Sequence, residues 1–192
     1  MYNGFVTSEE NRRRDALHAS LRWAWTVLFQ CDRIDQTQNQ LAREARIRDR
    51  NFDQPEREKH FRLDADRHFL FVAGRQLARA LSMLAFGTQP PASIAAVTTI
   101  RNCFEHWDEK EGALAVTNPK DPRGRAYRKF KAKHPDSEPE AHSWGAGGTL
   151  IGGVDVNGLQ EDVRRIFDDL IRLEESGWVW TGRLPGDTED PP

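Results

Sequence analysis

The chain has 192 residues, of which 38% are apolar and 30% are charged, and its formal net charge is −2. This length suits a single domain, and the composition predicts a soluble protein with one modest core. The near-neutral charge excludes a uniformly basic surface for nucleic acid but leaves room for a local basic patch. The longest apolar run, residues 69–73, is too short to span a membrane, and the first 14 residues lack the apolar segment of a signal peptide. We therefore expect a cytoplasmic protein without a membrane segment.

The two cysteines predict neither a disulfide nor a metal site. Cys31 and Cys103 both lie among apolar neighbours in helical patterns, which is typical of free buried thiols in a reducing compartment. No Cys-x-x-Cys occurs, so the sequence offers no thiolate zinc site. We expect no metal and no other cofactor.

The N-terminal part of the chain predicts two long helices. Thr7 and Glu10 have the spacing of a capping box, and neither glycine nor proline follows them before residue 55. The first helix is therefore expected to run past residue 45, with a second half that is mostly exposed to solvent. Pro55 suits a first helical position, and the second helix is expected to extend from there to about Phe86.

The second helix carries a leucine seam, a line of residues at alternating spacings of three and four. Gly74 in the middle of this seam would let another helix approach closely. The seam either joins two copies of the chain or forms the core of a bundle within one chain, and the sequence leaves both open. Its members are Arg67, Leu70, Gly74, Leu77, Leu81 and Leu84.

The third helix is predicted from about Pro91 to about Gly112, after a break in the chain at residues 87–91. Residues 113–149 are rich in proline, glycine and charge, which predicts a long surface loop that ends in a turn at 144–148. Two short runs then flank Gly152 and Gly153, which is the signature of a β-hairpin with a two-residue turn.

The last helix is expected over residues 159–175, with Gly177 as its stop signal. Trp178 and Trp180 alternate in a short segment that we expect to be extended and to pack back on the core. The whole pattern predicts an all-α fold, a bundle of four or five helices with a small β-hairpin insertion before the last helix. We assign residues 1–184 to one helical domain, with the basic loop and hairpin of 113–158 as its insertion, and residues 185–192 to a disordered acidic tail.

Arg101, Asn102 and His106 form the most informative group of residues, in the second half of the third predicted helix. Asn102 and His106 are four residues apart and share a helix face, which the long side chain of Arg101 can reach. An arginine can hold a phosphate with two hydrogen bonds, and a histidine can move a proton near neutral pH. Such a trio supports metal-independent cleavage of RNA, in which the ribose 2′-OH attacks the neighbouring phosphorus. One motif supplies one histidine, so two copies of the chain meeting at a two-fold axis would supply two.

The pattern Arg-Asn-x-x-x-His on a late helix of an all-α bundle resembles the ribonuclease motif of the HEPN family (higher eukaryotes and prokaryotes nucleotide-binding). The similarity covers roughly residues 5–110 and the last helix. It implies a symmetric homodimer whose two motifs face each other in a cleft, metal-independent endoribonuclease activity, and catalytic roles for Arg101, Asn102 and His106. It also implies a setting in toxin–antitoxin or antiviral defence systems, with an antitoxin or another protein as partner.

Two further interpretations of the motif stay open. Arg101 can pair with Glu105 at the i,i+4 spacing, with His106 beside Glu109 and Lys110, as an ordinary solvated helix face. The same residues can also bind a ligand without cleaving it.

Residues 120–134 form the one strongly basic segment, in which basic side chains alternate with Tyr127 and Phe130. Phosphate contacts by the basic residues and base stacking by the aromatic ones suit single-stranded RNA, while a solvated mobile loop is the alternative. The residues that we expect to bind RNA are Arg123, Arg125, Tyr127, Arg128, Lys129 and Lys131.

His60, Asp64 and His68 are spaced like metal ligands on one helix face. Arginines and a lysine nearby oppose a cation, so we expect a polar stripe instead. A second hypothesis is that His68 or Arg67 reaches the motif from a facing helix.

The sequence thus predicts a homodimeric, metal-independent endoribonuclease that cleaves single-stranded RNA. One alternative is a non-catalytic helical module that binds a partner protein through the leucine seam and exposed aromatic residues. Another is a module that binds a nucleotide or a different small molecule in the same cleft without cleaving it.

Overall fold

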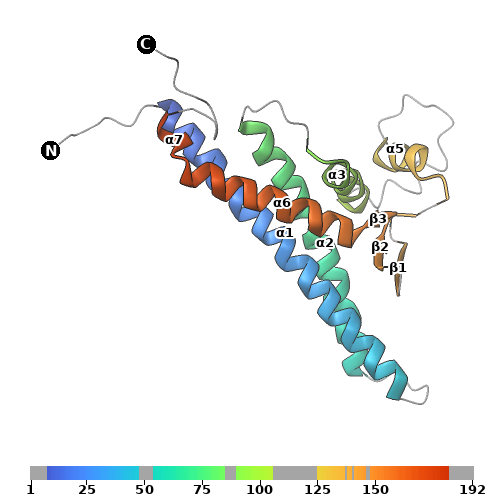
Figure 1. The fold of residues 1–192 in the computed structure, drawn as a ribbon. Coiled ribbons are helices and arrows are strands. Elements are labelled where there is room, and N and C mark those ends of the chain that lie inside the picture. Colours follow the sequence, from blue (N-terminus) through green and yellow to red (C-terminus); the bar gives the residue numbers. More distant parts are fainter. Residues whose placement is uncertain are drawn as a thin grey trace, which may run out of the picture.

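A computed structural model shows an all-α bundle with a small β-sheet, which confirms the predicted fold class (Figure 1). Thr7 of the predicted capping box, His106, Arg123 and the predicted tail lie outside the described residues. The residues that the structure describes are 8–47, 54–84, 90–105, 125–136, 138–139, 141–145 and 148–181. The helices are α1 (Ser8–Ile47), α2 (Gln54–Met83), α3 (Ala92–Glu105), α5 (Arg125–Lys133), α6 (Val156–Glu175) and α7 (Trp178–Thr181), and the strands are β1 (His142–Gly145), β2 (Gly148–Ile151) and β3 (Val154–Asp155).

The helices α1 and α2 form a long antiparallel pair (Figure 1). Two contacts between them fix this direction. Arg33 Nε lies 3.0 Å from Asp66 Oδ1, and Glu44, further along α1, pairs with Lys59, which comes earlier on α2. The first helix runs past residue 45 as predicted. Its second half is more buried than predicted. Only four of residues 34–44 are exposed, and Gln38 is buried along with Ile34 and Leu41.

The leucine seam of α2 faces α3 of the same chain. Leu70 and Leu77 are fully buried, and a Cβ atom on Gly74 would lie 2.5 Å from Val97 Cγ1. The close approach predicted at Gly74 is therefore confirmed, and the approaching helix is α3. Because its leucines are covered within the single chain, the seam serves as bundle core and is not free to join two copies or to bind a partner protein.

The remaining long helix, α6, packs on α1 and completes the bundle (Figure 1). Every long helix contributes fully buried apolar side chains to one continuous core. Those at 0% exposure include Leu17, Val27, Ile34, Leu70, Leu77, Ile94, Ile100, Leu159 and Val163.

The predicted hairpin is present as β2 and β3, with Ile151 paired to Val154. Gly152 and Gly153 have φ angles of +56° and +79°, which are the two positive values that this tight turn requires. The strand β1 extends the sheet in the antiparallel order β1-β2-β3. It lies in the segment that the sequence assigned to a loop, so that part of the prediction is wrong.

Two contacts attach this sheet to the helices. Thr149 Oγ1 donates a hydrogen bond of 2.7 Å to Gln38 Oε1 of α1, and both residues are buried. At the turn, a Cβ atom on Gly152 would lie 2.8 Å from Ile100 Cδ1 of α3. The hairpin insertion therefore packs directly beside Arg101, the residue that follows Ile100.

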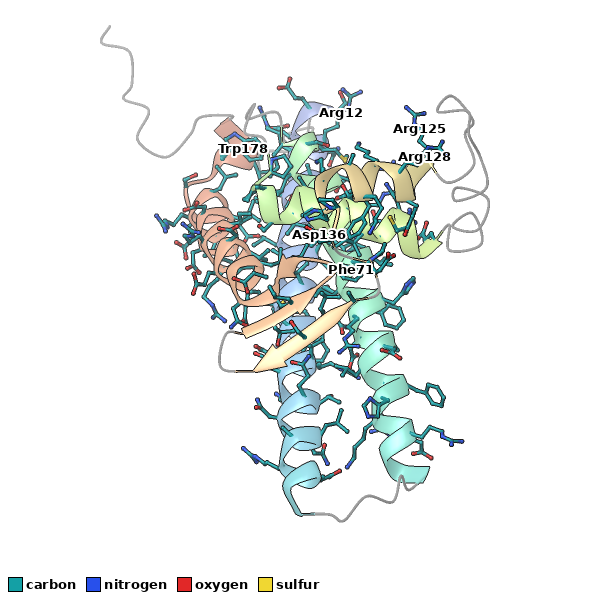
Figure 2. All side chains as sticks on the ribbon, turned by 90° about the vertical axis from the view of Figure 1, so that its right-hand side faces the viewer. Arg12, Phe71, Arg125, Arg128, Asp136 and Trp178 are labelled. Carbon is teal, nitrogen blue, oxygen red and sulfur yellow. The ribbon has the colours of Figure 1, made fainter. Side chains whose placement is uncertain are left out.

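The C-terminal segment departs from its predicted form. Gly177, with φ of +71°, ends α6 as predicted, but the following residues form the short helix α7 and not an extended piece. Trp178 (Figure 2) is 4% exposed, and Arg13 Nε donates a hydrogen bond of 3.2 Å to the Val179 carbonyl oxygen. The segment packs back on the core as expected, in a helical conformation.

Both cysteines are free and buried, as predicted. Burial, reinforced by the carboxylates of Asp35 and then Asp32, raises the pKa of Cys31 to about 12, so this thiol stays protonated and unreactive. None of the described helices combines the length and the apolar character needed to cross a membrane.

Candidate nucleic-acid site

Arg101 and Asn102 lie near the C-terminal end of α3, which the buried side chains of Val97 and Ile100 hold in the core. The Arg101 side chain starts at the edge of this core and is 17% exposed, and Asn102 is half-buried. His106 comes directly after the last residue of α3 and outside the described residues. The predicted alignment of Asn102 with His106 therefore stays a prediction.

The guanidinium of Arg101 has two partners on its own helix. Its Nη1 donates to Asn102 Oδ1 at 3.2 Å, and its Nη2 forms an ion pair with Glu105. Its Nε is buried and has no hydrogen-bond partner in the described part of the chain. The pair with Glu105 is the one that the solvated-face interpretation predicts. A phosphate that bound Arg101 with two hydrogen bonds would have to displace this carboxylate.

A second arginine with unused donors lies on α2. Arg67 is 5% exposed, and its Nη1 donates to Asp64 Oδ1 at 3.0 Å. Its Nε and Nη2 are buried and find no hydrogen-bond partner among the described residues. Burial lowers the pKa of Arg67, and the Asp64 carboxylate opposes this shift. An unmet buried donor costs about 1–3 kcal/mol, so the guanidinium is predisposed to bind an anion.

Arg67 and Arg101 lie on the sides of α2 and α3 that face each other. Arg67 is seven residues before Gly74 on the leucine seam, Arg101 is four residues after Val97, and Gly74 contacts Val97. Figure 2 shows α3 lying across α2 at a steep angle. Arg67 is about 10 Å from the Gly74–Val97 contact along α2, and Arg101 is about 6 Å from it along α3. The hypothesis that Arg67 reaches the motif from a facing helix therefore stays a prediction.

The described part of the basic segment is a helix, α5, where the sequence predicted a loop. Its two aromatic residues, Tyr127 and Phe130, are 8% and 0% exposed, and the Tyr127 hydroxyl donates to Glu138 Oε2 at 2.9 Å. Tyr127 is therefore part of the core and not a surface for base stacking, which corrects its predicted role. The missed signal is the helical spacing of three and then four residues from Tyr127 to Phe130 to His134. The His134 ring stacks on Phe130, with ring centroids 5.0 Å apart.

The basic side chains of α5 remain at the surface. Arg125 and Lys129 are exposed, whereas Arg128 and Lys131 are half-buried, and Lys131 Nζ lies 3.2 Å from Glu138 Oε1. Figure 2 shows α5 packed alongside α3, with Arg125 and Arg128 toward the outer edge of the molecule. The fold thus brings the basic segment next to the helix that carries Arg101, although the two are separated by more than twenty residues in sequence.

The histidine stripe of α2 gives no metal centre. Asp64, the central residue between His60 and His68, is already bonded to Arg67. Across the described ranges, no group of three or more His, Cys, Asp or Glu side chains is arranged to hold a metal ion.

Comparison with known proteins assigns this chain to no family. The chain matches no protein-family model, no curated protein and no solved structure.

Proposed function

We propose that this protein is a HEPN-like, metal-independent endoribonuclease that cleaves single-stranded RNA. The observation that carries the proposal is the packing of the basic helix α5 against α3, the helix of Arg101 and Asn102. An RNA strand held through its phosphates by Arg125, Arg128 and Lys129 would pass beside the motif.

Each motif residue has a role in the proposed reaction. Arg101 stabilises the negative charge that builds on the phosphorane oxygens when the ribose 2′-OH attacks the phosphorus. His106 takes the proton from the attacking hydroxyl or delivers one to the leaving oxygen. Asn102, whose amide oxygen already accepts a hydrogen bond from Arg101, orients the guanidinium. The products are a 2′,3′-cyclic phosphate and a free 5′-hydroxyl.

Buried arginine nitrogens without partners, on α2 and on α3, support a role in holding phosphate. Arg67 leaves two buried nitrogen atoms, Nε and Nη2, without a partner and Arg101 leaves one, Nε, within the described residues. A phosphate oxygen accepts several hydrogen bonds and neutralises the buried charge at the same time. We include Arg67 in the proposed site as a phosphate-positioning residue.

The proposed active form is a homodimer, because a second copy of the motif would supply the second histidine of an acid–base pair. A toxin or defence component, controlled by an antitoxin or another protein partner, is the setting that the family resemblance implies.

The test is cleavage of a labelled single-stranded RNA in excess EDTA by the wild type and by His106→Ala. His18→Ala is the matched control, because this exposed histidine lies on α1, away from the motif helix. We expect the wild type and His18→Ala to leave a 2′,3′-cyclic phosphate, and folded His106→Ala to be inactive. DNA of the same sequence should stay intact because it lacks the 2′-OH. Equal cleavage by wild type and His106→Ala, or none by either, would reject the proposal.

A further inference from the structure

The outer surface of the α1–α2 pair carries exposed aromatic rings. Trp25 and Phe29 stack on each other, with ring centroids 5.2 Å apart and planes inclined by 10°. They are 56% and 40% exposed, and Phe69 on α2 is 55% exposed. Clustered exposed rings of this size leave apolar area in water and mark a site that binds something.

The rings of the two helices lie on the same side of the pair. Arg33 of α1 connects the two helices on this side. Its guanidinium pairs with Asp66 of α2 and lies 5.8 Å from the centre of the Phe29 ring. Phe29 is one turn before Arg33, and Phe69 is one turn after Asp66. Because the helices are antiparallel, these two steps lead in the same direction, and Trp25 continues the row by a further turn.

The two helix segments that carry these rings have a positive net charge. Residues 22–33 and 62–79 contain six arginines and three aspartates, and all three aspartates are engaged. Asp66 pairs with Arg33, Asp64 with Arg67, and Asp32 accepts a hydrogen bond from Gln160. By contrast, the exposed arginines 22, 62 and 79 form no ion pair with a carboxylate of the described residues.

We propose that this aromatic face, formed by Trp25, Phe29, Phe69, Arg22, Arg62 and Arg79, binds single-stranded nucleic acid. Bases stack on the three rings, and backbone phosphates pair with the three arginines. The surplus of arginines complements a polyanion. It disfavours a symmetric contact with a second copy of the chain, which would bring arginines to arginines.

This inference rests on the proposed function for the identity of the strand, which would be RNA. The aromatic face lies on α1 and α2, whereas the basic residues near the motif lie on α5 and pack against α3. It therefore acts as a separate holding surface, which keeps a long strand bound while one segment of it occupies the motif.

The experiment uses a fluorescent 2′-O-methyl oligoribonucleotide, which this reaction cannot cleave because it has no free 2′-OH. Binding to the full chain is followed by fluorescence anisotropy. Trp25→Ala/Phe29→Ala is expected to weaken binding about 5- to 100-fold, the usual effect of losing a stacking ring. Leu150→Ala, an exposed apolar residue of the hairpin, is the control and should bind like the wild type.

A second measurement tests the phosphate contacts. Replacing Arg22, Arg62 and Arg79 by glutamine should lower the slope of log affinity against log salt by about 2, or about 0.7 for each lost contact with a single strand. The charge-matched control replaces the exposed α6 arginines 164, 165 and 172 by glutamine, and its slope should not change. Circular dichroism is used to check that all variants are folded.

Unchanged affinity and slope in the aromatic-face variants would overturn the inference. It would also be overturned if Trp25→Ala/Phe29→Ala turned a dimer into a monomer in sedimentation velocity without affecting the oligonucleotide, because the face would then belong to a protein contact. A failure of the proposed nuclease function would give a different result from a failure of this inference. A wild type that binds the probe through this face but leaves unmodified RNA intact would retain the nucleic-acid site and reject the nuclease.

Discussion

Replacing Arg67 by methionine is expected to stabilise the protein in a buffer without multivalent anions. The substitution removes two buried nitrogen atoms, Nε and Nη2, that lack partners in the described part of the chain, each costing about 1–3 kcal/mol. It also removes the bond to Asp64, whose side chain is 67% exposed, and such a pair contributes only about 0.2–1 kcal/mol. Methionine keeps much of the buried volume and is a good helix former. The net expectation is an increase of about 1–6 kcal/mol in the free energy of unfolding.

The assay is urea unfolding followed by circular dichroism, in a chloride buffer with and without a few millimolar phosphate. Phosphate should stabilise the wild type, because it binds the folded state through Arg67, and should have little effect on Arg67→Met. The variant thereby controls for the general stabilising effect of phosphate as an excluded salt. Ionic strength is held constant with sodium chloride.

A loss of more than about 1 kcal/mol in Arg67→Met without phosphate would refute the reasoning, because it would mean that the donors are satisfied in the folded protein. Equal stabilisation of both proteins by phosphate would show that the anion binds elsewhere.

Three further predictions follow from particular contacts. Gly74→Ala should destabilise the fold by about 1–3 kcal/mol in urea unfolding, because its Cβ would lie 2.5 Å from Val97 Cγ1, and Val97→Ala in the same chain should recover part of that loss. Burial, and then the Asp32 carboxylate, raise the pKa of Asp35, so the ionised carboxyl weakens the fold as pH rises above its unfolded-state pKa. Asp35→Asn should therefore increase the free energy of unfolding more at pH 7 than at pH 3.5, and an equal gain at both values would contradict this. Glu105→Gln should tighten phosphate or RNA binding about 1.5- to 5-fold in a titration, because it removes the carboxylate that occupies Arg101, and weaker binding would count against the proposed site.

Much of the fold follows from local patterns in the sequence. The apolar periods of the long helices, the stop signal at Gly177 and the hairpin turn at Gly152 and Gly153 each depend on residues close together in the chain. The close helix approach at Gly74 was predictable for the same reason, since only glycine lacks the Cβ that would block it. Helix α5 was missed because the proline and glycine on either side of it outweighed one short amphipathic repeat.

The sequence by itself determined which residues can do chemistry, and the tertiary structure decided which of them lie together. Arg101, Asn102 and His106 are recognisable by spacing alone, because a helix places residues four apart on one face. The meeting of the leucine seam with α3, the packing of α5 beside the motif helix and the burial of Arg67 are long-range outcomes. They depend on how several amphipathic surfaces share one core, which no local window of sequence contains. The same packing left Trp25, Phe29 and Phe69 exposed on one face, because the core of the bundle was already filled by other side chains.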